Sequence, residues 1–391
     1  MKKHPLMTNN ISRKDLDKVI KHLKKKDPML TQHNNVRLFE KKWSNWLGVK
    51  YSVFVNSGSS ANYISLKILK EITKKKEIIV SPLNWVSDIS SILLAGFKPI
   101  FLDINPKNLC LDVDKIKEKI NSNTAAVLLT HILGFNGLNE KFLSLIKKKN
   151  IFLIEDVCES HGATFKKKKL GSYGKISNFS FYYAHHISTI EGGMICTNDQ
   201  NIYEMARMFR SHGMVREISN ENYKNRLLKK YPDLHKNFIF EYPGFNMRNT
   251  EIGAIIGLSQ LNSLDKNNKI RSRNFKFFLD NLDSDLFVTK FDIVGSSNYA
   301  LIVVLRKEKV QLREKLEEIM VKNQIEFRRG TACGGNHLRQ PYLKKILKNI
   351  NLKNFQNVDH MHFYGYYIGN YPSLDIGSIK KITKILNSIN D

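Results

Sequence analysis

The sequence predicts an α/β protein with a mostly parallel sheet, and three observations support this class. Short apolar runs that suit buried strands recur along the first half of the chain, and stretches with helical spacing separate them. Parallel strands need such helical crossovers, and strands covered on both faces carry continuous apolar runs. The 391 residues are also enough for one large domain and one smaller domain.

The chain opens with two predicted amphipathic helices. Apolar residues recur at helical spacing over residues 11–30 and again over 36–47. Gly48 suits the end of the second helix, because glycine readily adopts the left-handed conformation found there. Residues 51–56 then predict a short buried strand, and a turn leads into a helix over 63–72.

Strands and helices alternate after this point. The predicted strands cover 77–81, 99–103, 125–131 and 151–156, and the helices between them cover 86–95, 113–120 and 140–149. The segment 178–193 begins as a strand, turns through a polar loop with two histidines and leaves through a glycine pair. A helix over 202–211, a loop rich in charge and tyrosine over 215–245 and an apolar helix over 249–264 follow. This order is typical of a parallel sheet with helices on both faces.

The composition shifts near residue 265, where a charged helix over 265–281 begins. Beyond it, the pattern predicts strands over 299–305 and 326–329 and helices over 311–322 and 379–389. We therefore expect a large α/β domain over residues 1–265 and a smaller α+β domain over 266–391.

The net charge of +27 comes without a nucleic-acid-binding motif. The lysines are spread along helix-like segments such as 18–26 and 141–149, which favours a solvated basic surface over a nucleic-acid site. A positive field would still help to capture an anionic substrate. We expect no nucleic-acid partner.

The sequence also bears on the compartment. No run of 18 or more uncharged apolar residues occurs, and the segment after Met1 lacks the apolar core of a signal peptide. The four cysteines, Cys110, Cys158, Cys196 and Cys333, contain no CxxC pair, which indicates neither a disulfide framework nor a zinc site. We therefore expect a cytoplasmic protein that does not contact a membrane.

A first candidate for chemistry is Ser57-Gly58-Ser59-Ser60, between a predicted strand and a predicted helix. Glycine allows a tight turn, and a helix N-terminus offers unpaired N–H groups and partial positive charge to a phosphate. The alternative is an ordinary helix cap, where serine is favoured without any ligand. The motif matches neither the P-loop nor the dinucleotide fingerprint.

Further candidates lie in or directly after other strands. Asp156 ends an apolar strand, where open α/β sheets bind ligands, so its carboxylate could pair with a cationic ring nitrogen. A capping or solvated carboxylate is the alternative. Trp85 follows another strand, and its indole could stack on a planar cofactor, although tryptophan also suits a core. With Ser180 in a later strand, these are the parts of a pyridoxal phosphate (PLP) site.

With these motifs in this order, nearly the whole chain resembles the DegT/DnrJ/EryC1/StrS family of nucleotide-sugar aminotransferases. The matching segments include Ser57-Gly58-Ser59, Glu155-Asp156, His161-Gly162-Ala163, Phe179-Ser180-Phe181 and residues 39–40, 99–104, 191–194, 210–213 and 244–248. The number of ordered matches argues against coincidence. The resemblance implies the PLP-dependent transferase fold type I, that of aspartate aminotransferase.

The resemblance implies cofactor-binding roles at five positions. Gly58, Ser59 and Ser60 would hold the cofactor phosphate, and Ser180 would join them. Asp156 would keep the pyridine nitrogen protonated, which makes the ring an electron sink.

Four further roles are implied in the same way. Trp85 would stack on the ring, and Glu159 stands where most relatives have a glutamine that touches the phenolic oxygen. Asn246 would reach the phosphate from the neighbouring subunit, which implies a homodimer with shared active sites. Arg216 is a weak candidate for binding an anionic group of the substrate.

The departure from the family pattern is at His185. Relatives that transfer amines have a lysine five residues after Ser180, which forms a Schiff base, and no lysine lies between Lys175 and Lys224 here. The cofactor, as PLP or pyridoxamine phosphate (PMP), would therefore be bound non-covalently. Histidine carries protons near neutral pH, because its unperturbed pKa is about 6.5 against about 10.4 for lysine. We leave His186 out of the catalytic set.

This substitution resembles the 3-dehydratase branch of the family. One type in that branch carries an iron–sulfur cluster on cysteines; Cys158 could match one ligand, but residues 214–245 contain no cysteine, so we expect no cluster. The expected reaction removes the C3 hydroxyl of a nucleotide-linked 4-keto-6-deoxy hexose, with L-glutamate regenerating PMP, in deoxysugar and O-antigen biosynthesis. A PLP-dependent 4-aminotransferase is one alternative, and a non-catalytic cofactor-binding protein is another. The nucleotide and the sugar stay open.

Overall fold

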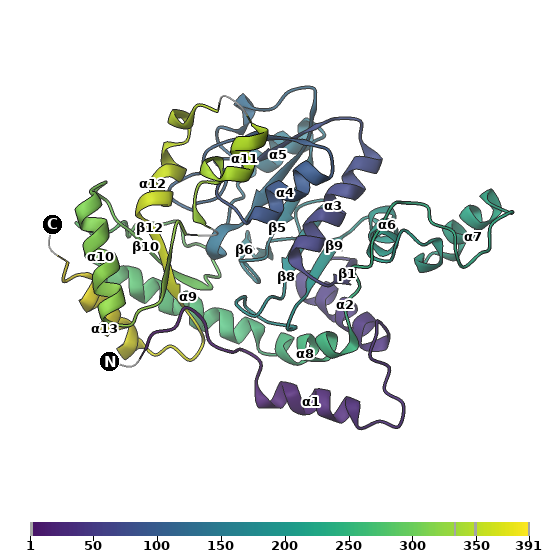
Figure 1. The fold of residues 1–391 in the computed structure, drawn as a ribbon, viewed down its shortest axis with the longest axis horizontal. Coiled ribbons are helices and arrows are strands. Elements are labelled where there is room, and N and C mark those ends of the chain that lie inside the picture. The colour runs from purple at the N-terminus through teal and green to yellow at the C-terminus, as the bar shows by residue number, and fades with distance from the viewer. Residues whose placement is uncertain (1–2, 332–333, 348–349, 390–391) are drawn as a thin grey trace.

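A seven-stranded sheet in the order β1-β9-β8-β5-β4-β2-β3 forms the centre of the computed structural model, which describes residues 3–331, 334–347 and 350–389 (Figure 1). Its strands are β1 (Tyr51–Val55), β2 (Glu77–Val80), β3 (Lys98–Phe101), β4 (Thr124–Thr130), β5 (Phe152–Asp156), β8 (Ile176–Ser180) and β9 (Gly193–Thr197). The pairs β2–β3, β2–β4, β4–β5 and β5–β8 are parallel, whereas β9 pairs antiparallel with β1 and β8. The predicted α/β class with a mostly parallel sheet is confirmed.

Helices cover both faces of this sheet. They are α2 (Asn34–Leu47), α3 (Gly58–Ile72), α4 (Val86–Leu94), α5 (Glu140–Lys148), α6 (Gln200–Arg210) and α8 (Glu251–Leu261), and α1 (Arg13–Leu23) packs on α8. Along β1, Phe54 packs in one apolar cluster with Phe39 and Trp43 of α2, whereas Val53 and Val55 pack in another with α3 and α6. Apolar residues on both sides of a strand are the pattern of a sheet that is buried on two faces.

The predicted helix over 113–120 is wrong. The chain forms only a 3-10 turn there, Ile116–Glu118. An isolated bridge between Ile104 and Leu111 precedes this turn, and the mutually bonded Asn121 and Thr124 follow it. Tight structure on both sides leaves too few residues for a stable α-helix.

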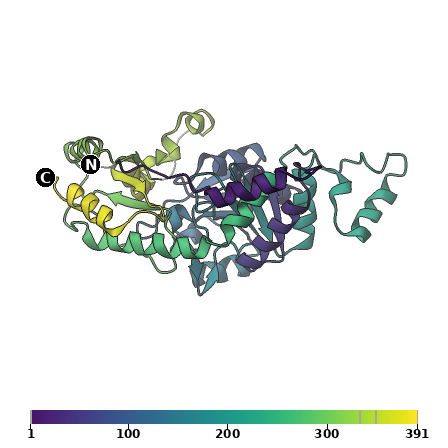
Figure 2. The ribbon, with the colours of Figure 1, turned by 90° about the horizontal axis from the view of Figure 1, so that it is seen from below.

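The predicted loop over 215–245 contains a helix, α7 (Glu221–Lys230). Asn220 caps it by accepting a hydrogen bond from the backbone N–H of Tyr223 (2.9 Å), but Leu227 is its only buried residue. The sequence therefore showed no apolar stripe by which to recognise it. The helix sits on an arm that projects from the body of the protein in both views (Figures 1 and 2).

A second, three-stranded antiparallel sheet lies in the C-terminal part, in the order β10-β12-β11. Its strands are β10 (Ala300–Val304), β11 (Phe327–Arg329) and β12 (Gly365–Gly369), and its helices are α9 (Leu264–Asn281), α10 (Val310–Lys322), α11 (Pro341–Ile346), α12 (Gln356–Tyr364) and α13 (Ile376–Leu386). The central strand β12 begins and ends with a glycine. Glycine is more typical of turns than of strands, and the sequence analysis did not predict this strand. A small hairpin of β6 (Thr164–Phe165) and β7 (Lys168–Lys169) completes the strands of the described residues. The division at residue 265 stays a prediction.

The N-terminal strap, residues 3–10, joins the small sheet to the large one. The His4 N–H donates to the Gln324 carbonyl (2.9 Å), and the Glu326 N–H donates to the His4 carbonyl (2.9 Å). At its other end, the Asn10 side-chain amide donates to the backbone carbonyl of His185 (3.1 Å). Residues 181–192, between β8 and β9, form the histidine loop. The strap therefore holds this loop against the C-terminal part of the chain.

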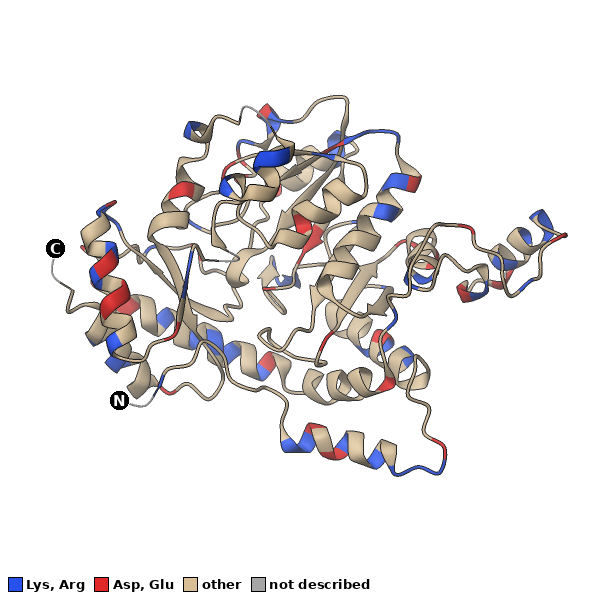
Figure 3. Cartoon of the chain, in the orientation of Figure 1, with Lys and Arg blue, Asp and Glu red and all other residues tan. Residues whose placement is uncertain are grey.

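Lysine and arginine are distributed over many helices rather than gathered on one element (Figure 3). This distribution fits the predicted solvated basic surface. Among the described residues, no helix combines the length and the apolarity needed to cross a membrane.

One buried ion pair joins strand β1 of the large sheet to helices α2 and α6. Arg210 at the end of α6 donates through Nη1 to Glu40 Oε1 of α2 (2.6 Å) and to the Phe54 carbonyl of β1 (3.0 Å). The same Glu40 oxygen accepts the Phe54 N–H (2.8 Å). Both side chains are buried, so each charge depends on the other for its partner.

We predict that Arg210→Met lowers the free energy of unfolding by about 3–5 kcal/mol, because it leaves the Glu40 charge buried and unpaired. Urea unfolding of the purified variant measures the loss. Lys276→Met, which removes an exposed cation that pairs with Asp280 (2.7 Å), is the matched control and should cost no more than about 0.5 kcal/mol. Equal effects of the two substitutions would contradict the prediction.

Candidate active site

The start of α3 and the end of β8 form the first part of the site. A Cβ atom on Gly58 would lie 2.6 Å from the Cβ of Ser180, so only glycine allows this approach. The approach brings Gly58 beside Ser180, and the predicted phosphate-binding role of these residues with Ser59 and Ser60 stays a prediction. As at any helix start, the first N–H groups lack partners within the helix. The four residues together can cradle a phosphate.

Ser57 is the N-cap of this helix, so the alternative role proposed for the serines holds at that position. Its Oγ accepts a hydrogen bond from the Ser60 N–H (3.0 Å) and donates to the Ser60 Oγ (3.0 Å). The cap fixes the direction of the first turn. Capping at Ser57 and anion binding further along the turn are therefore compatible.

Asp156, at the carboxyl end of β5, is buried and tied to a second carboxylate. The Asn62 side-chain amide donates to Asp156 Oδ2 (2.7 Å) and to Asp88 Oδ1 (2.6 Å), and Thr130 Oγ1 donates to Asp88 Oδ2 (2.7 Å). The Cys158 N–H donates to the other Asp156 oxygen (2.9 Å). Burial and the neighbouring Asp156 raise the pKa of Asp88 well above its usual range.

Glu159 lies further along the same loop and is also buried. Its Oε2 accepts the Leu133 N–H (2.7 Å), and its Oε1 accepts from the Tyr299 hydroxyl (3.3 Å). Burial raises the pKa of Glu159 to about 7, and the hydrogen bond from Leu133 opposes this shift. Near neutral pH this side chain can therefore accept or donate a hydrogen bond, which suits contact with a phenolic oxygen.

His185 lies in the loop between β8 and β9. Its ring centroid is 5.9 Å from that of Tyr299 and 6.2 Å from that of His161, and its Nδ1 is buried with no partner in the described part of the chain. Burial lowers the pKa of His185 to about 4, and the charge of Asp156 only partly opposes the shift. The pKa of His185 therefore lies below the unperturbed value of about 6.5 for histidine. The imidazole is neutral at physiological pH, which is the form that accepts a proton.

His186 has a different environment from its neighbour. It is 2% exposed, its Nε2 contacts the Ser297 carbonyl (2.8 Å), and its ring stacks on His161 with centroids 5.0 Å apart. These contacts give His186 a role in holding the loop.

Trp85 is 54% exposed and precedes α4, so it is not a core residue. Its indole is free to stack on a ligand. Asn246 and Arg216 are not brought to the site within one chain. Asn246 is exposed and accepts the Arg248 N–H (3.2 Å), and Arg216 lies over the Phe238 ring on the arm.

Sequence reasoning missed Asn62, Asp88 and Tyr299. Asn62 lies one helical turn after the glycine of the cradle, on the side of α3 that faces the sheet, and this spacing was a usable signal. Asp88 and Tyr299 follow no motif. Only the fold brings them to the site.

The site fits a group with a phosphate, a flat ring and a cationic ring nitrogen. The helix start suits the phosphate, Trp85 suits the ring, and Asp156 is a buried carboxylate with no cation within 4 Å in the described part of the chain. A buried carboxylate gains most from a charged N–H partner. PLP has these three features. No group of three metal-ligating side chains gathers among the described residues, and Cys333 lies outside them.

The chain matches the DegT/DnrJ/EryC1/StrS aminotransferase family over residues 10–386. It is 30% identical over 349 residues to the GDP-4-keto-6-deoxy-D-mannose 3-dehydratase of Escherichia coli O55:H7. The aligned region covers 88% of this chain and 89% of that protein.

Two solved structures are similar over almost the whole chain. The E. coli GDP-4-keto-6-deoxy-D-mannose-3-dehydratase with bound hydrated PLP has a TM-score of 0.88 at 28% identity, over 98% of this chain and 99% of that one. A GDP-4-keto-6-deoxymannose-3-dehydratase with a trapped PLP-glutamate geminal diamine has the same TM-score and identity, over 98% and 100%. The chain therefore belongs to the DegT/DnrJ/EryC1/StrS aminotransferase family and has the fold of its PLP-dependent enzymes.

Proposed function

We propose that the protein is a PLP- and PMP-dependent 3-dehydratase of a nucleotide-linked 4-keto-6-deoxy hexose. L-Glutamate supplies the amine that regenerates PMP, and the pathway is deoxysugar or O-antigen biosynthesis. The observation that carries this proposal is His185, in the position where relatives that transfer amines have a lysine, together with the proposed cofactor-binding residues. The named relatives, one with PLP and one with a PLP-glutamate adduct, support it.

In this proposal, different residues of the chain bind the phosphate and the ring nitrogen of the cofactor. When bound, the cofactor supplies an amine and a ring that stores electrons. Gly58, Ser59, Ser60 and Ser180 hold its phosphate, and no covalent bond to the protein is needed. Asp156 keeps the ring nitrogen protonated, and Asn62 fixes the orientation of that carboxylate.

His185 moves the proton that the reaction requires. The neutral imidazole accepts a proton at one ring nitrogen, and the resulting cation can return it to the departing C3 hydroxyl, which leaves as water. The low pKa of the free imidazole makes its cation a strong acid, which favours this return. A lysine at this position would instead present an amine that links to the cofactor.

We also propose a cytoplasmic homodimer with shared active sites. Asn246 is exposed, and the same turn lies against β1, because the Asn56 N–H donates to the Met247 carbonyl (3.0 Å). We propose, as the family resemblance implies, that the exposed Asn246 side chain binds the cofactor phosphate of a second copy. Arg216 is a weak candidate for binding an anionic group of the nucleotide sugar. Its contact with the Phe238 ring does not point to such a role.

The main alternative is a 4-aminotransferase, the activity named in the family's description. It would need another amine or acid–base group in place of lysine. A nucleotide-linked amino sugar that retains its C3 oxygen, identified by mass spectrometry, would favour it. A cofactor-binding protein without catalysis would instead leave the bound PLP spectrum unchanged on addition of glutamate.

His185→Asn should lower the rate of sugar dehydration by about 10²–10⁴-fold, because it removes the acid–base group and leaves the cofactor site intact. The assay incubates enzyme, PLP, L-glutamate and a panel of nucleotide 4-keto-6-deoxy sugars, and it scores ammonia and 3-deoxy product. His186→Asn is the control and should stay within tenfold of the wild type. A near-normal rate of dehydration by His185→Asn would contradict the proposed acid–base role of His185. His185→Lys should retain PLP covalently after borohydride reduction and denaturation.

Stability at acid pH reports the state of His185. Its folded-state pKa of about 4 lies below the unfolded value of about 6.5, so between these pH values the unfolded chain binds a proton that the folded chain does not. Stability is therefore lost as the pH falls from 6.5 to 4. In urea unfolding at pH 7, 6 and 5, His185→Asn should make the free energy of unfolding fall less steeply with pH. The control His235→Asn, at an exposed position, should leave this slope unchanged. Parallel curves for wild type and His185→Asn would contradict the assignment.

Mixed dimers test the shared site. His185→Asn and Asn246→Ala homodimers should both have low activity, because each site lacks one group. Co-refolded heterodimers contain one site with both native residues, so activity should reappear at about a quarter of the wild-type level in a statistical mixture. Mixing the two folded variants without exchange is the control. No recovery after subunit exchange would place Asn246 and His185 in the same subunit's site.

A further inference from the structure

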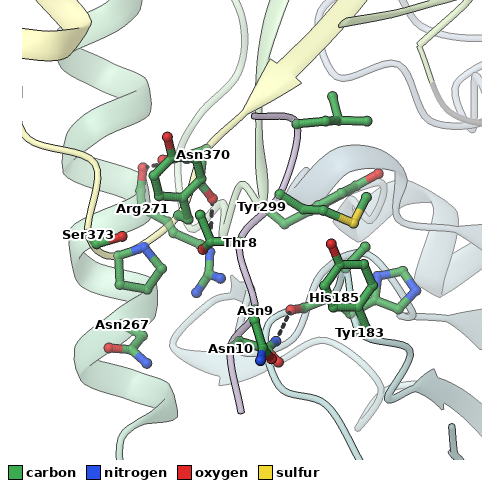
Figure 4. Close-up of a pocket in the computed structure, with 15 residues that line it drawn as sticks. Thr8, Asn9, Asn10, Tyr183, His185, Asn267, Arg271, Tyr299, Asn370 and Ser373 are labelled. Carbon is green, nitrogen blue, oxygen red and sulfur yellow. Dashed lines mark hydrogen bonds between the residues drawn. The ribbon is translucent and has the colours of Figure 1, made fainter. Parts of the chain in front are cut away.

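A cavity of about 220 Å³ lies between α9, the N-terminal strap, the histidine loop and residues 370–373 (Figure 4). Its polar lining includes the side chains of Asn267, Asn370, Thr8 and Ser373. One cation, Arg271, lines the cavity, and none of the described lining residues is Asp or Glu. A cavity with donors, one guanidinium and no carboxylate is suited to an anion.

Arg271 is buried without an acidic partner. It is 4% exposed, its Nε donates to the Asn370 carbonyl (3.2 Å), and its Nη1 is buried with no hydrogen-bond partner in the described part of the chain. No described carboxylate lies within 4 Å of it. Burial lowers the pKa of Arg271 to about 10, so the group remains a cation at neutral pH. An unpaired buried cation is costly and gains strongly from an anionic ligand.

The cavity adjoins the candidate active site through two residues. His185 and Tyr299 both line it, and the Tyr299 hydroxyl contacts Glu159. Figure 4 shows Arg271 and Asn267 on α9 on one side and Tyr183, His185 and Tyr299 on the other, with the strap between them. An anion bound by Arg271 would therefore share this cavity with the proposed base.

We propose that this cavity binds a carboxylate of the amino donor, with Arg271 as its charged ligand. The inference rests on the proposed function, in which L-glutamate is the donor. The volume favours an amino acid over the sugar nucleotide, because pockets for larger ligands measure about 300–1,000 Å³. A 4-keto-6-deoxy hexose carries no carboxylate, and the phosphates of a nucleotide sugar are a different kind of anion, so the test compares a dicarboxylate with pyrophosphate.

The test separates the donor half-reaction from dehydration. In PLP-loaded enzyme, glutamate converts PLP to PMP, and the change in absorbance gives the glutamate concentration for half-maximal rate. Arg271→Gln should raise this concentration by about tenfold or more, because it removes a charged hydrogen-bond partner. Arg273→Gln, on the same helix but outside the cavity lining, is the matched control and should leave it unchanged. In PMP-loaded enzyme, which needs no donor, Arg271→Gln should slow a single turnover of sugar dehydration by a smaller factor than it raises this glutamate concentration.

A second variant keeps the proposal testable if Arg271→Gln does not fold. Asn267 lies one helical turn before Arg271 and also lines the cavity, so Asn267→Asp places a carboxylate where it can pair with the guanidinium. This variant should weaken the binding of glutarate, an unreactive dicarboxylate, by about tenfold in titration calorimetry. Pyrophosphate is the second probe, and it should bind more weakly than glutarate at this site.

The outcomes distinguish the two proposals. Unchanged glutamate dependence in Arg271→Gln, unchanged glutarate binding in Asn267→Asp, or tighter binding of pyrophosphate than of glutarate would overturn the carboxylate site. If the wild type dehydrates no sugar, the proposed function fails. Glutarate binding that is lost in Asn267→Asp would support the site even then.

Discussion

The site depends on one hydrogen-bonding group, the Asn62 amide, which binds two buried carboxylates at once. Asn62 is four residues after Gly58 on α3, so a single turn of about 6 Å separates the phosphate cradle from the group that orients Asp156. The distance between the two ends of a cofactor is thus set by a rigid helix. Asp88 can remain beside Asp156 because its raised pKa keeps it protonated, so the pair does not carry two adjacent charges.

The histidine loop is fixed by contacts that reach every neighbouring layer. The strap holds the His185 carbonyl, the Gln260 side chain of α8 accepts the Ser188 N–H (2.9 Å), and His186 contacts Ser297. Within this loop, Ile190 has a φ of +72°, which a β-branched residue adopts only where the surroundings compensate for the strain. These anchors hold an uncharged imidazole, whose Nδ1 is buried, in place without any covalent bond to a cofactor.

Much of the fold could be predicted because its elements follow local rules. Alternating apolar strands and helices defined the parallel sheet, and Gly48 marked a helix end correctly, whereas α3 begins at Gly58 rather than at the predicted residue 63. Helix α7 and strand β12 were missed because one buries a single residue and the other is flanked by glycines. The candidate residues with sequence motifs could be named from the sequence, and their roles stay predictions. Asp88 and Tyr299 come from unrelated segments that only tertiary contacts bring together. The lowered pKa of His185 could not be foreseen either, because burial produces it.

The chemistry of this family depends on what stands beside a common cofactor site. In relatives that transfer amines, the lysine links to the cofactor and carries protons, whereas an imidazole can only exchange protons with it. Replacing one by the other leaves the proposed phosphate cradle, the exposed indole of Trp85 and the buried Asp156 unchanged, so we expect non-covalent cofactor binding to remain. Both kinds of enzyme need an external amine donor. In the proposed dehydration, proton transfer next to a C3 hydroxyl leads to loss of water, and the amine of PMP leaves as ammonia. The donor must replace that amine in every turnover, and the cationic cavity proposed for the donor would serve this step.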